Sequence, residues 1–342
     1  MLNFQLFHSS PTFLHLLDEY LEYKNNIYDD ILNPINEEKL DLNEKVENLT
    51  KKLNEFEKNT NAVLDSYNLY FDNFFKHYEI KPKKLVRSSH DLNLELLDFI
   101  DNICKKYDLQ WWLFAGTLLG AIRHSGFIPW DDDCDINMIR ADYEKLLEII
   151  DDEIIKNNMR DFIKVTTSAK TSNGVFLPFM KLEYRVEGRL YGFIDIFPSD
   201  YIINVIDDIK NVYKKEHDIA IKNLKKGVNR KEVLEKAFKV LNVSKTKTDI
   251  IMPGVENSLR SYAIYDYKTI FPLQLIKFED RKYPCPNDSI KYIISLYGKE
   301  YMKIPKIIFH HGFYDFLLKH ENVYETFDKH IALLKEVNKN FD

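Results

Sequence analysis

The stretch of sequence that decides the fold runs from Trp112 to Tyr143 and reads W-L-F-A-G-T-L-L-G-A-I-R-H-S-G-F-I-P-W-D-D-D-C-D-I-N-M-I-R-A-D-Y. Four aspartates fall within five positions of this stretch: Asp131, Asp132, Asp133 and Asp135. Like charges this close together are unfavourable unless water or a cation screens them. Apolar residues follow directly at positions 136, 138 and 139, so the chain continues into a core instead of remaining in solvent.

An extended backbone would sort these aspartates by face, because successive side chains of a strand point to opposite sides. Asp131, Asp133 and Asp135 would then share one face, while Cys134 and Ile136 would point the other way into the core. We therefore predict a row of carboxylates along a strand. Such a row suits a hard divalent cation with oxygen ligands, Mg²⁺ or alternatively Mn²⁺.

The residues just upstream have the pattern of a phosphate-binding turn. Residues 111–114 predict a short apolar strand, Ala115-Gly116-Thr117 predicts a turn, and residues 118–123 predict a short helix. Gly116 allows the backbone to come close to a ligand. Thr117 can cap the helix and can offer a hydroxyl and an amide to a phosphate. We interpret the whole unit as a phosphate cradle followed by a metal site.

A further carboxylate, Asp195, is expected to join this site. It carries the charge in the otherwise apolar run Y-G-F-I-D-I-F-P, which ends at Pro198. Burying an unpaired carboxylate in such a strand is costly. Strand pairing could bring Asp195 to within about 4–6 Å of Asp133 or Asp135, where one cation bridges the carboxylates. The alternative is that a lysine or arginine neutralises it.

The motifs resemble a known family. Gly116-Thr117, followed by the Asp-x-Asp pair at Asp133 and Asp135, resembles the DNA polymerase beta-type nucleotidyltransferase superfamily. The longer string G-T-L-L-G-A-I-R-H-S-G-F-I-P-W-D-D-D-C-D-I resembles the LicD family, relatives of fukutin and fukutin-related protein. D-I-F-P and parts of residues 271–305 are similar to the same family, although Asp280 stands where glycine is usual. The resemblance covers about residues 90–312.

The resemblance implies a metal-dependent phosphotransferase. Such an enzyme moves a phosphorylated group, typically phosphocholine, from a CDP-activated donor such as CDP-choline to a cell-surface glycan or a lipid-linked glycan. On this interpretation Asp133 and Asp135 bind the metal, and Asp195 shares it or accepts the proton of the acceptor hydroxyl. Asp131 ligates the metal or orients a metal-bound water.

The donor phosphates are expected to meet a second set of residues. Gly116 and Thr117 would hold them through backbone amides and a hydroxyl, and Arg123 and Lys181 would contribute positive charge. For Lys181, which lies in the middle of a predicted strand, a salt bridge is an equally good interpretation. His310 and His311 are further candidates, with a structural role as the alternative.

The remaining pattern predicts an α+β fold, a nucleotidyltransferase-like mixed sheet flanked by helices. We expect helices from Ser88 or Ser89 to Tyr107 and from Arg140 to about 157, strands over 162–167, 175–184 and 190–197, a turn at Glu187-Gly188, and charged helices over 201–245. The lysines of the last region could approach anionic lipid or a phosphorylated glycan. Such runs more often form a solvated surface.

A helical extension is predicted to precede this domain. Apolar residues at alternating steps of four and three form a heptad seam over residues 42–74, in which only Thr60 is polar. Lys81-Pro82 marks the expected boundary, so residues 1–82 form the extension and residues 83–342 the catalytic domain. The seam either joins copies of the chain into a homo-oligomer or packs against residues 10–30 of the same chain.

Composition narrows the class of protein. The chain has 342 residues and a net charge of −6, which argues against broad nucleic-acid binding. No apolar run approaches the roughly 18–20 residues of a membrane span, and no signal peptide opens the chain. The three cysteines are scattered, as expected of reduced thiols. We therefore expect a cytoplasmic protein, with peripheral attachment to a membrane as a variant of this.

Two other functions are alternatives for these motifs. A glycosyltransferase can also use an Asp-x-Asp pair and a metal to bind a nucleotide sugar, but that fold needs several strand-helix units before the motif. A non-catalytic coiled-coil scaffold with a degenerate domain is the second alternative. The complete set of aspartates argues against it.

Overall fold

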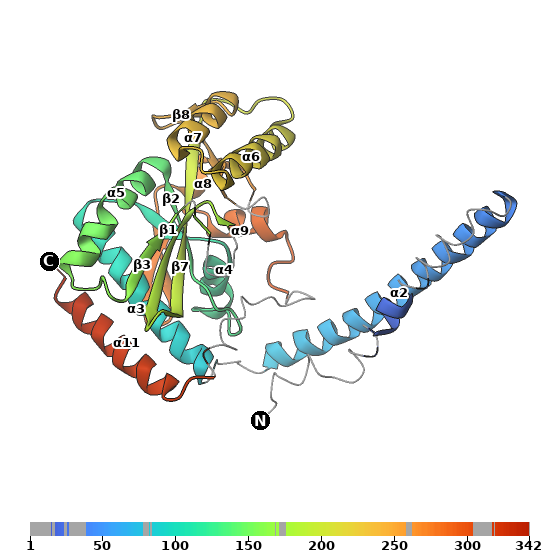
Figure 1. Cartoon of the computed structure of the whole chain (residues 1–342), viewed down its shortest axis with the longest axis horizontal. Coiled ribbons are helices and arrows are strands. Elements are labelled where there is room, and N and C mark those ends of the chain that lie inside the picture. The colour runs from blue at the N-terminus through green and yellow to red at the C-terminus, as the bar shows by residue number, and fades with distance from the viewer. Residues whose placement is uncertain are drawn as a thin grey trace. The chain divides into compact units, whose positions relative to one another are not determined.

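The structure, a computed structural model, describes residues 15, 18–23, 26, 39–77, 82, 84–167, 169–170, 176–257, 262–303, 317 and 319–341. The chain divides into two compact units, residues 1–74 and residues 75–342. Figure 1 shows the helix α2 in the first unit and the sheet in the second. The boundary near residue 82 stays a prediction about independent folding. His310 and His311 lie outside the described residues.

Helices and strands alternate along the larger unit. Its helices include α3 (Leu85–Lys106), α4 (Ala115–His124), α5 (Arg140–Lys156), α6 (Ile209–Lys225), α7 (Arg230–Val240), α8 (Tyr267–Ile270), α9 (Ser289–Tyr297) and α11 (Val323–Lys339). Its strands include β1 (Trp111–Leu113), β2 (Asp135–Ile139), β3 (Ile163–Thr166), β4 (Ala169–Lys170), β5 (Phe176–Leu177), β6 (Met180–Val186), β7 (Arg189–Ile202), β8 (Val243–Ser244), β9 (Ile250–Pro253), β10 (Tyr265–Asp266), β11 (Gln274–Phe278) and β12 (Arg281–Cys285). The predicted α+β fold is confirmed.

The main sheet is mixed and has the order β1-β2-β7-β6-β3. β2 and β7 are parallel, whereas β1 pairs with β2, β6 with β7, and β3 with β6 in antiparallel fashion. Beyond β2, the long strand β7 goes on to pair with β8 and β9. β7 therefore runs through the whole unit, and the aspartate motif enters the sheet beside it.

The two faces of the sheet are covered differently. Figure 1 shows α3, α5 and α11 on one side of the sheet and α4 and α9 on the other. Gly192 of β7 lies against α3, since a β-carbon there would be 2.3 Å from Oδ1 of Asn93. Ile194 and Ile196 point to the same side and are fully buried. Because side chains alternate along a strand, Asp195 points to the opposite face, away from α3.

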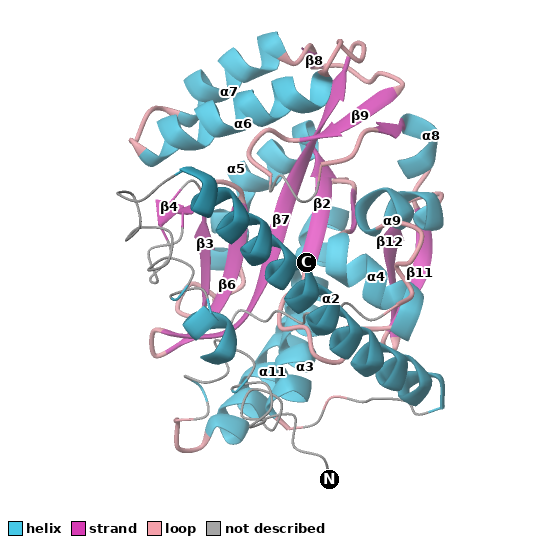
Figure 2. Ribbon diagram, turned by 90° about the vertical axis from the view of Figure 1, so that its right-hand side faces the viewer, coloured by secondary structure: helices cyan, strands magenta, loops and turns pink. Residues whose placement is uncertain are grey.

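Residues 203–247, which contain α6, α7 and β8, form a subdomain at the end of β7, and we call it the α6–α7 subdomain. Figure 2 shows it at the upper end of the sheet, with β7 and β9 reaching towards β8. It packs on the strand ends around a separate apolar core: Ile202, Tyr213, Ala220, Leu224, Val233, Leu234, Ala237, Leu241, Met252 and Val255. This core is distinct from the main one beneath α3.

The N-terminal unit is dominated by α2 (Lys39–His77), an uninterrupted helix of 39 residues, as the heptad pattern predicted. The rings of Tyr20 and Tyr23 stack on Phe56 of this helix, with centroid separations of 5.8 and 6.1 Å. These contacts support packing of that part of the seam within the chain. Other seam residues remain exposed: Val46, Leu53, Val63 and Tyr67. Within the described residues, no helix combines the length and apolar character needed to cross a bilayer.

Three local predictions were wrong. The helix expected to begin at Ser88 or Ser89 begins at Leu85, after Lys84 with a positive φ of 54°, and Ser89 is buried inside it. Residues 115–117 do not form a separate turn, because they are the first residues of α4. The third concerns the aspartates. β2 begins only at Asp135, and residues 131–134 form a loop.

Candidate metal and phosphate site

Strand pairing brings Asp135, Asp195 and Lys181 side by side. Asp135 of β2 lies opposite Asp195 of β7, and Lys181 of β6 lies opposite Asp195 on its other side. The three side chains therefore share one face of the sheet. The Lys181 ammonium nitrogen is 2.9 Å from Oδ1 of Asp195. The expected approach of Asp195 to the motif is confirmed, and so is its salt bridge to a lysine.

The carboxylates of the strand pair are close enough to share one cation. Oxygens from Asp133, Asp135 and Asp195 lie within 4.8 Å of one another. Because Mg²⁺ and Ca²⁺ bind oxygen at about 2.0–2.6 Å, a single ion can reach all three carboxylates. An all-oxygen set of this kind fits the hard divalent cation expected from the sequence. The assignment of these three residues as metal ligands stays a prediction.

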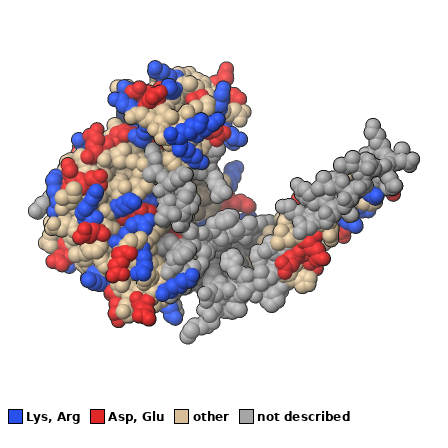
Figure 3. Space-filling model, in the orientation of Figure 1, with Lys and Arg blue, Asp and Glu red and all other residues tan. Residues whose placement is uncertain are grey.

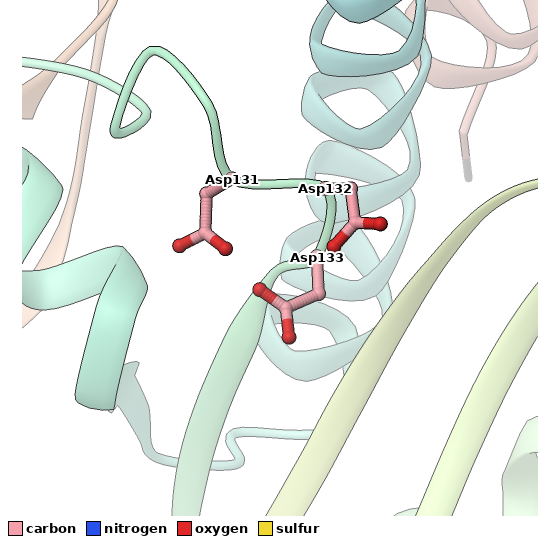
Figure 4. Close-up of side chains that lie close together, drawn as sticks. All are labelled: Asp131, Asp132 and Asp133. Carbon is pink, nitrogen blue, oxygen red and sulfur yellow. The ribbon is translucent and has the colours of Figure 1, made fainter. Parts of the chain in front are cut away.

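Asp131, Asp132 and Asp133 lie on the loop that leads into β2, not on the strand itself (Figure 4). The N–H of Asp131 donates to the carbonyl of Ile128 at 2.9 Å, and this turn keeps the segment out of the sheet. The predicted row of carboxylates along a strand is therefore wrong upstream of Asp135. Oxygens from the three loop aspartates nevertheless lie within 4.8 Å of one another.

Loop and strands together form one acidic cluster, because Asp133 belongs to both groups of carboxylates. We use the name acidic cluster for these residues: Asp131, Asp132, Asp133, Asp135 and Asp195. Asp132 is fully buried and was not among the predicted site residues. Strict alternation along a strand would have placed it on the far face, and the loop removes that restriction.

The electrostatics of the cluster favour an added positive charge. Burial raises the pKa of the Asp135 carboxyl well above its ordinary value, and the charges of Asp133 and Asp195 raise it further. Lys181 acts in the opposite direction without cancelling the effect. Bringing a cation among these carboxylates would favour their ionised forms.

The start of α4 faces this cluster. A β-carbon on Gly116 would lie 2.9 Å from Oδ2 of Asp131 and 4.0 Å from Oδ2 of Asp135, so glycine is what allows the approach. Ala115 has a φ of 40°, a backbone conformation that residues other than glycine rarely adopt. The chain thus turns sharply from β1 into α4 at the edge of the site.

The prediction that Thr117 caps α4 is wrong, because Thr117 lies inside the helix. Its hydroxyl oxygen accepts a hydrogen bond of 2.7 Å from the backbone N–H of Asp135. Thr117 therefore fixes the first residue of β2. A contact between Thr117 or Gly116 and a donor phosphate stays a prediction.

The two predicted phosphate-binding cations lie in different settings. Lys181 is buried, with its ammonium above the Phe193 ring and beside Asp195. Arg123 lies at the edge of the site, donates to the backbone carbonyls of Tyr301 and Lys303 at 3.2 Å, and stands over the Trp130 ring. Both are near the acidic cluster, and their contacts with phosphate stay predictions.

Two side chains distant in sequence hold the loop between α4 and β2, residues 125–134, which we call the motif loop. Nε2 of His90 on α3 is 2.7 Å from the backbone oxygen of Asp131, and its ring stacks on Phe127. Burial lowers the pKa of His90 to about 4, so the ring is neutral near pH 7 and Nε2–H donates to the carbonyl. Glu279, in the turn between β11 and β12, accepts from the N–H of Phe127 at 3.2 Å and from Arg87 at 2.8 Å.

The loop between α4 and β2 has little spare room. A β-carbon on Gly126 would lie 2.3 Å from Oε1 of Glu279, and one on Gly120 would lie 2.4 Å from the backbone oxygen of Gly126. The N–H of Glu279 also donates to the carbonyl of Ser125 at 2.7 Å. The β11–β12 turn therefore packs directly against the loop that carries the aspartates.

Tyr297, the last residue of α9, was also not predicted as a site residue. Although the residue is 45% exposed, burial of its hydroxyl raises the pKa of Tyr297, and the charges of Asp135 and Asp131 raise it further. Sequence could have indicated Tyr297 and Glu279 through the family-like blocks in residues 271–305. His90 offered no such signal, because one histidine on a helix face is usually structural.

A second group of charges gathers near the ends of β2 and β7. Arg140, which follows β2, makes paired hydrogen bonds to Asp200 at 2.8 and 2.8 Å and to Glu256 at 2.6 and 2.8 Å. Arg230 of α7 contacts Glu256 at 3.0 Å and Glu144 of α5 at 2.8 and 2.9 Å. We call these five residues the ion network.

The ion network sets two arginines against three carboxylates. Burial alone would raise the pKa of Glu256, but Arg140 and Arg230 outweigh it and hold the value at about 2. For Asp200 burial is the larger effect, and its pKa is raised although Arg140 lowers it in part. The network joins α5, α7 and the β7–β9 pair, and it serves the fold.

Comparison with known proteins identifies the domain around the acidic cluster. Residues 108–231 match the family model described as LicD/FKTN/FKRP, nucleotidyltransferase domain. This span contains β1, α4, the motif loop, β2, β6 and β7, and therefore every member of the acidic cluster.

Individual relatives agree with this match. The chain is 26% identical over 249 residues to the lipopolysaccharide cholinephosphotransferase LicD of Haemophilus influenzae, covering 65% of this chain and 94% of that protein. It is 35% identical over 79 residues to an uncharacterized protein of Rickettsia prowazekii, covering 23% and 28% of the two chains. An uncharacterized protein of Rickettsia typhi is 37% identical over 67 residues, 20% of each chain.

Proposed function

Because this chain is a LicD-family transferase with a LicD/FKTN/FKRP nucleotidyltransferase domain, we propose that it transfers a substituted phosphate group such as phosphocholine. The donor is a CDP-activated compound such as CDP-choline, and the acceptor is a hydroxyl of a glycan or lipid-linked glycan. The observation that carries this proposal is the meeting of Asp133, Asp135 and Asp195 within 4.8 Å inside the matched domain. Transfer to a cell-surface polysaccharide would make the enzyme part of its biosynthesis.

The residues of the site have distinct parts in this proposal. Asp133, Asp135 and Asp195 hold a divalent cation, Mg²⁺ or Mn²⁺, and Asp131 ligates it or orients its water. The bound cation would supply charge neutralisation for the diphosphate oxygens of the donor. Gly116 lies where backbone amides at the start of α4 can approach a phosphate. Thr117 keeps Asp135 in place, and Arg123 meets phosphate from the outer edge.

The transfer itself is an in-line displacement at phosphorus. The acceptor oxygen forms a bond to the phosphorus that carries choline, while the bond from that phosphorus to the bridging oxygen breaks and CMP leaves. The hydroxyl proton passes to a carboxylate, and Asp195 is the candidate base. The Lys181 ammonium lies 2.9 Å from Oδ1 of Asp195 and places an opposite charge beside this carboxylate.

A donor panel tests this proposal. Purified protein is incubated with CDP-choline, CDP-ribitol or CDP-glycerol and Mg²⁺, and the release of CMP and the thermal stabilisation by each donor are measured. We expect one donor to stabilise the protein only when the metal is present. Equal behaviour in a chelator, or no response to any CDP compound, would contradict the proposal. Consumption of a nucleotide sugar would instead favour a glycosyltransferase, although only β1 precedes the motif among the described strands.

The N-terminal unit is proposed to mediate self-association through residues 42–74. The observation behind this is that Val46, Leu53 and Val63 remain 49%, 40% and 41% exposed on a regular heptad seam. Light scattering of the full-length protein, compared with Val46→Asp and Val63→Asp variants, provides the test. A monomeric full-length protein would remove this proposal and leave the packing of Tyr20 and Tyr23 on Phe56 as the use of the seam.

A further inference from the structure

The α6–α7 subdomain carries an excess of positive charge that the transfer reaction does not use. Residues 203–247 contain twelve Lys and Arg against six Asp and Glu, a net charge of +6 in a chain whose total is −6. Figure 3 shows lysine and arginine side chains gathered over the part of the molecule where Figure 1 labels α6 and α7. The rest of the chain is correspondingly acidic.

The lysines of α6 are available to an external partner. Five of them are exposed: Lys210, Lys214, Lys215, Lys222 and Lys225. None of the five forms an ion pair with an acidic side chain in the described part of the chain, whereas Lys236 of α7 pairs with Glu232. Acidic side chains nearby are fewer. Asp218 lies on the exposed side of α6, and Asp208 accepts hydrogen bonds from Asn211 at the start of the helix.

Some apolar side chains of the same subdomain are exposed. Ile203 and Val205, in the loop between β7 and α6, are 66% and 49% exposed, and Val240 at the end of α7 is 45% exposed. The N–H of Ile203 donates to the carbonyl of Asn242 at 2.9 Å, so this loop lies next to the end of α7. The three residues are absent from the apolar core of the subdomain, and the fold leaves them in water.

We infer that the α6–α7 subdomain is a membrane-docking surface for bilayers that contain anionic lipid. The lysines of α6 attract the negative surface, and Ile203, Val205 and Val240 insert between lipid headgroups. Peripheral binding of this kind depends on both terms, charge attraction and buried apolar area. The charge complementarity selects the lipid surface as the partner, and the exposed aliphatic side chains distinguish it from a soluble anionic glycan, which would bury no apolar side chains.

The loop geometry supports a preformed surface. Asn242 donates through its side-chain amide to Oδ1 of Asn204, and β8 pairs with the end of β7 at Ile202 and Val243. Ile203 and Val205 therefore flank a residue that is held in place. Docking of this surface requires no refolding, and it is independent of the transfer reaction.

Sedimentation with vesicles tests this inference on the full-length protein. Vesicles of phosphatidylcholine alone are compared with vesicles of phosphatidylcholine and phosphatidylglycerol, at low and at high salt. We expect binding to the anionic vesicles and its loss at high salt, because salt screens the charges. Absence of binding to anionic vesicles at low salt would overturn the inference.

Two sets of substitutions locate the surface. Replacing Lys214, Lys215 and Lys222 together by glutamine should weaken binding about 100-fold, at about fivefold for each lysine. Replacing Ile203, Val205 and Val240 together by asparagine should weaken it at least about tenfold, since buried apolar area is lost. Donor-dependent activity with soluble substrates should stay unchanged in both, because none of these residues belongs to the acidic cluster.

Matched controls complete the design. Leu275→Asn removes an apolar side chain that is 67% exposed on β11. Glutamine at Lys329, Lys335 and Lys339 of α11 removes the same charge from another helix. Both controls should bind vesicles like the unmodified protein. If they weaken binding as much as the α6–α7 variants do, or if the asparagine variant binds normally, the inference is wrong and the surface is a general polyanion site.

Discussion

The acidic cluster and the ion network are both built around β2 and β7, and each contains two buried carboxylates. Asp135 and Arg140 are five residues apart in the chain, as are Asp195 and Asp200. Side chains alternate along a strand, so Asp195 and Asp200 point to opposite faces of the sheet. On the α5 face, two arginines bind three carboxylates with distances of 2.6–3.4 Å. On the other face, the five aspartates of the acidic cluster lie close together, and Lys181 contacts Asp195 at 2.9 Å.

The difference shows how one strand pair can serve structure and chemistry separately. A buried charge is tolerated when an opposite charge and hydrogen bonds satisfy it. The ion network meets this condition with side chains of the chain itself, because Arg140 and Arg230 hold the pKa of Glu256 at about 2, although burial still raises the pKa of Asp200. The acidic cluster does not, and the pKa of Asp135 is raised. The face that carries the acidic cluster is therefore the one suited to bind an external cation.

The largest expected effect comes from Asp135→Asn. Loss of a ligand and of its charge should lower transfer at least about a thousandfold. The fold should persist, and thermal stability without metal should stay equal or rise, since repulsion is relieved. Turnover and thermal unfolding with and without Mg²⁺ measure both effects, with the exposed Asp152→Asn as control. Full activity of the Asp135 variant, or of the unmodified protein in a chelator, would contradict the assignment of Asp135 as a metal ligand.

Substitutions of Asp195 distinguish a role as metal ligand from a role as general base. Asp195→Ala should reduce turnover by roughly 10²–10⁴, with donor binding less affected. Asp195→Asn keeps the shape and weak ligation but cannot accept a proton. Activity of the asparagine variant well above that of the alanine variant would favour ligation, and equal activity would favour the base. Lys181→Met is the corresponding change at the salt-bridge partner of Asp195. Full activity of Asp195→Ala would mean that Asp195 does not belong to the site.

Substitutions in the ion network should affect the stability of the protein and not its catalysis. Arg140→Met leaves Asp200 and Glu256 buried without their main partner, and should destabilise the protein by about 3–5 kcal/mol. The control Arg160→Met breaks an exposed pair with Asp151 and should cost about 0–1 kcal/mol. Chemical denaturation measures both variants. Equal stability of the two variants would mean that the network is not what holds α5 and α7 to the sheet.

A smaller effect on the free energy of unfolding is expected at acidic pH. The pKa of Glu256 is lowered in the folded protein to about 2, from an ordinary value near 4.5. Its contribution to stability is therefore present above the ordinary value and is lost as the pH falls towards 2. The difference in unfolding free energy between the unmodified protein and Glu256→Gln should narrow over this range. A constant difference from pH 7 to pH 3 would contradict the assignment.

Local pattern was enough to predict some of these features. The alternation of strand side chains and the single charge in an apolar run indicated that Asp195 would meet Asp135. The heptad steps indicated a long helix. These inferences succeeded because each depends on periodicity within one segment, or on one pairing of strands.

Other features depend on contacts that no local pattern contains. Glu279 contacts Phe127 and Arg87, which are 152 and 192 residues away in the chain. Arg140 was expected only as the start of a helix, although it centres the ion network. The loop at 131–134 was mistaken for a strand because the turn formed by Asp131 and Ile128 is set by backbone hydrogen bonding. Side-chain alternation alone could not reveal it.

The crowding around Gly120 and Gly126 has a consequence for heritable variation in this loop. At Gly120 the obstacle is the backbone of Gly126, which no single replacement elsewhere can move aside. At Gly126 the obstacle is the end of the Glu279 side chain, which can be shortened. Position 120 should therefore stay glycine as the sequence drifts. Position 126 should drift to alanine most readily together with a change such as Glu279→Asp, so positions 126 and 279 should vary as a pair.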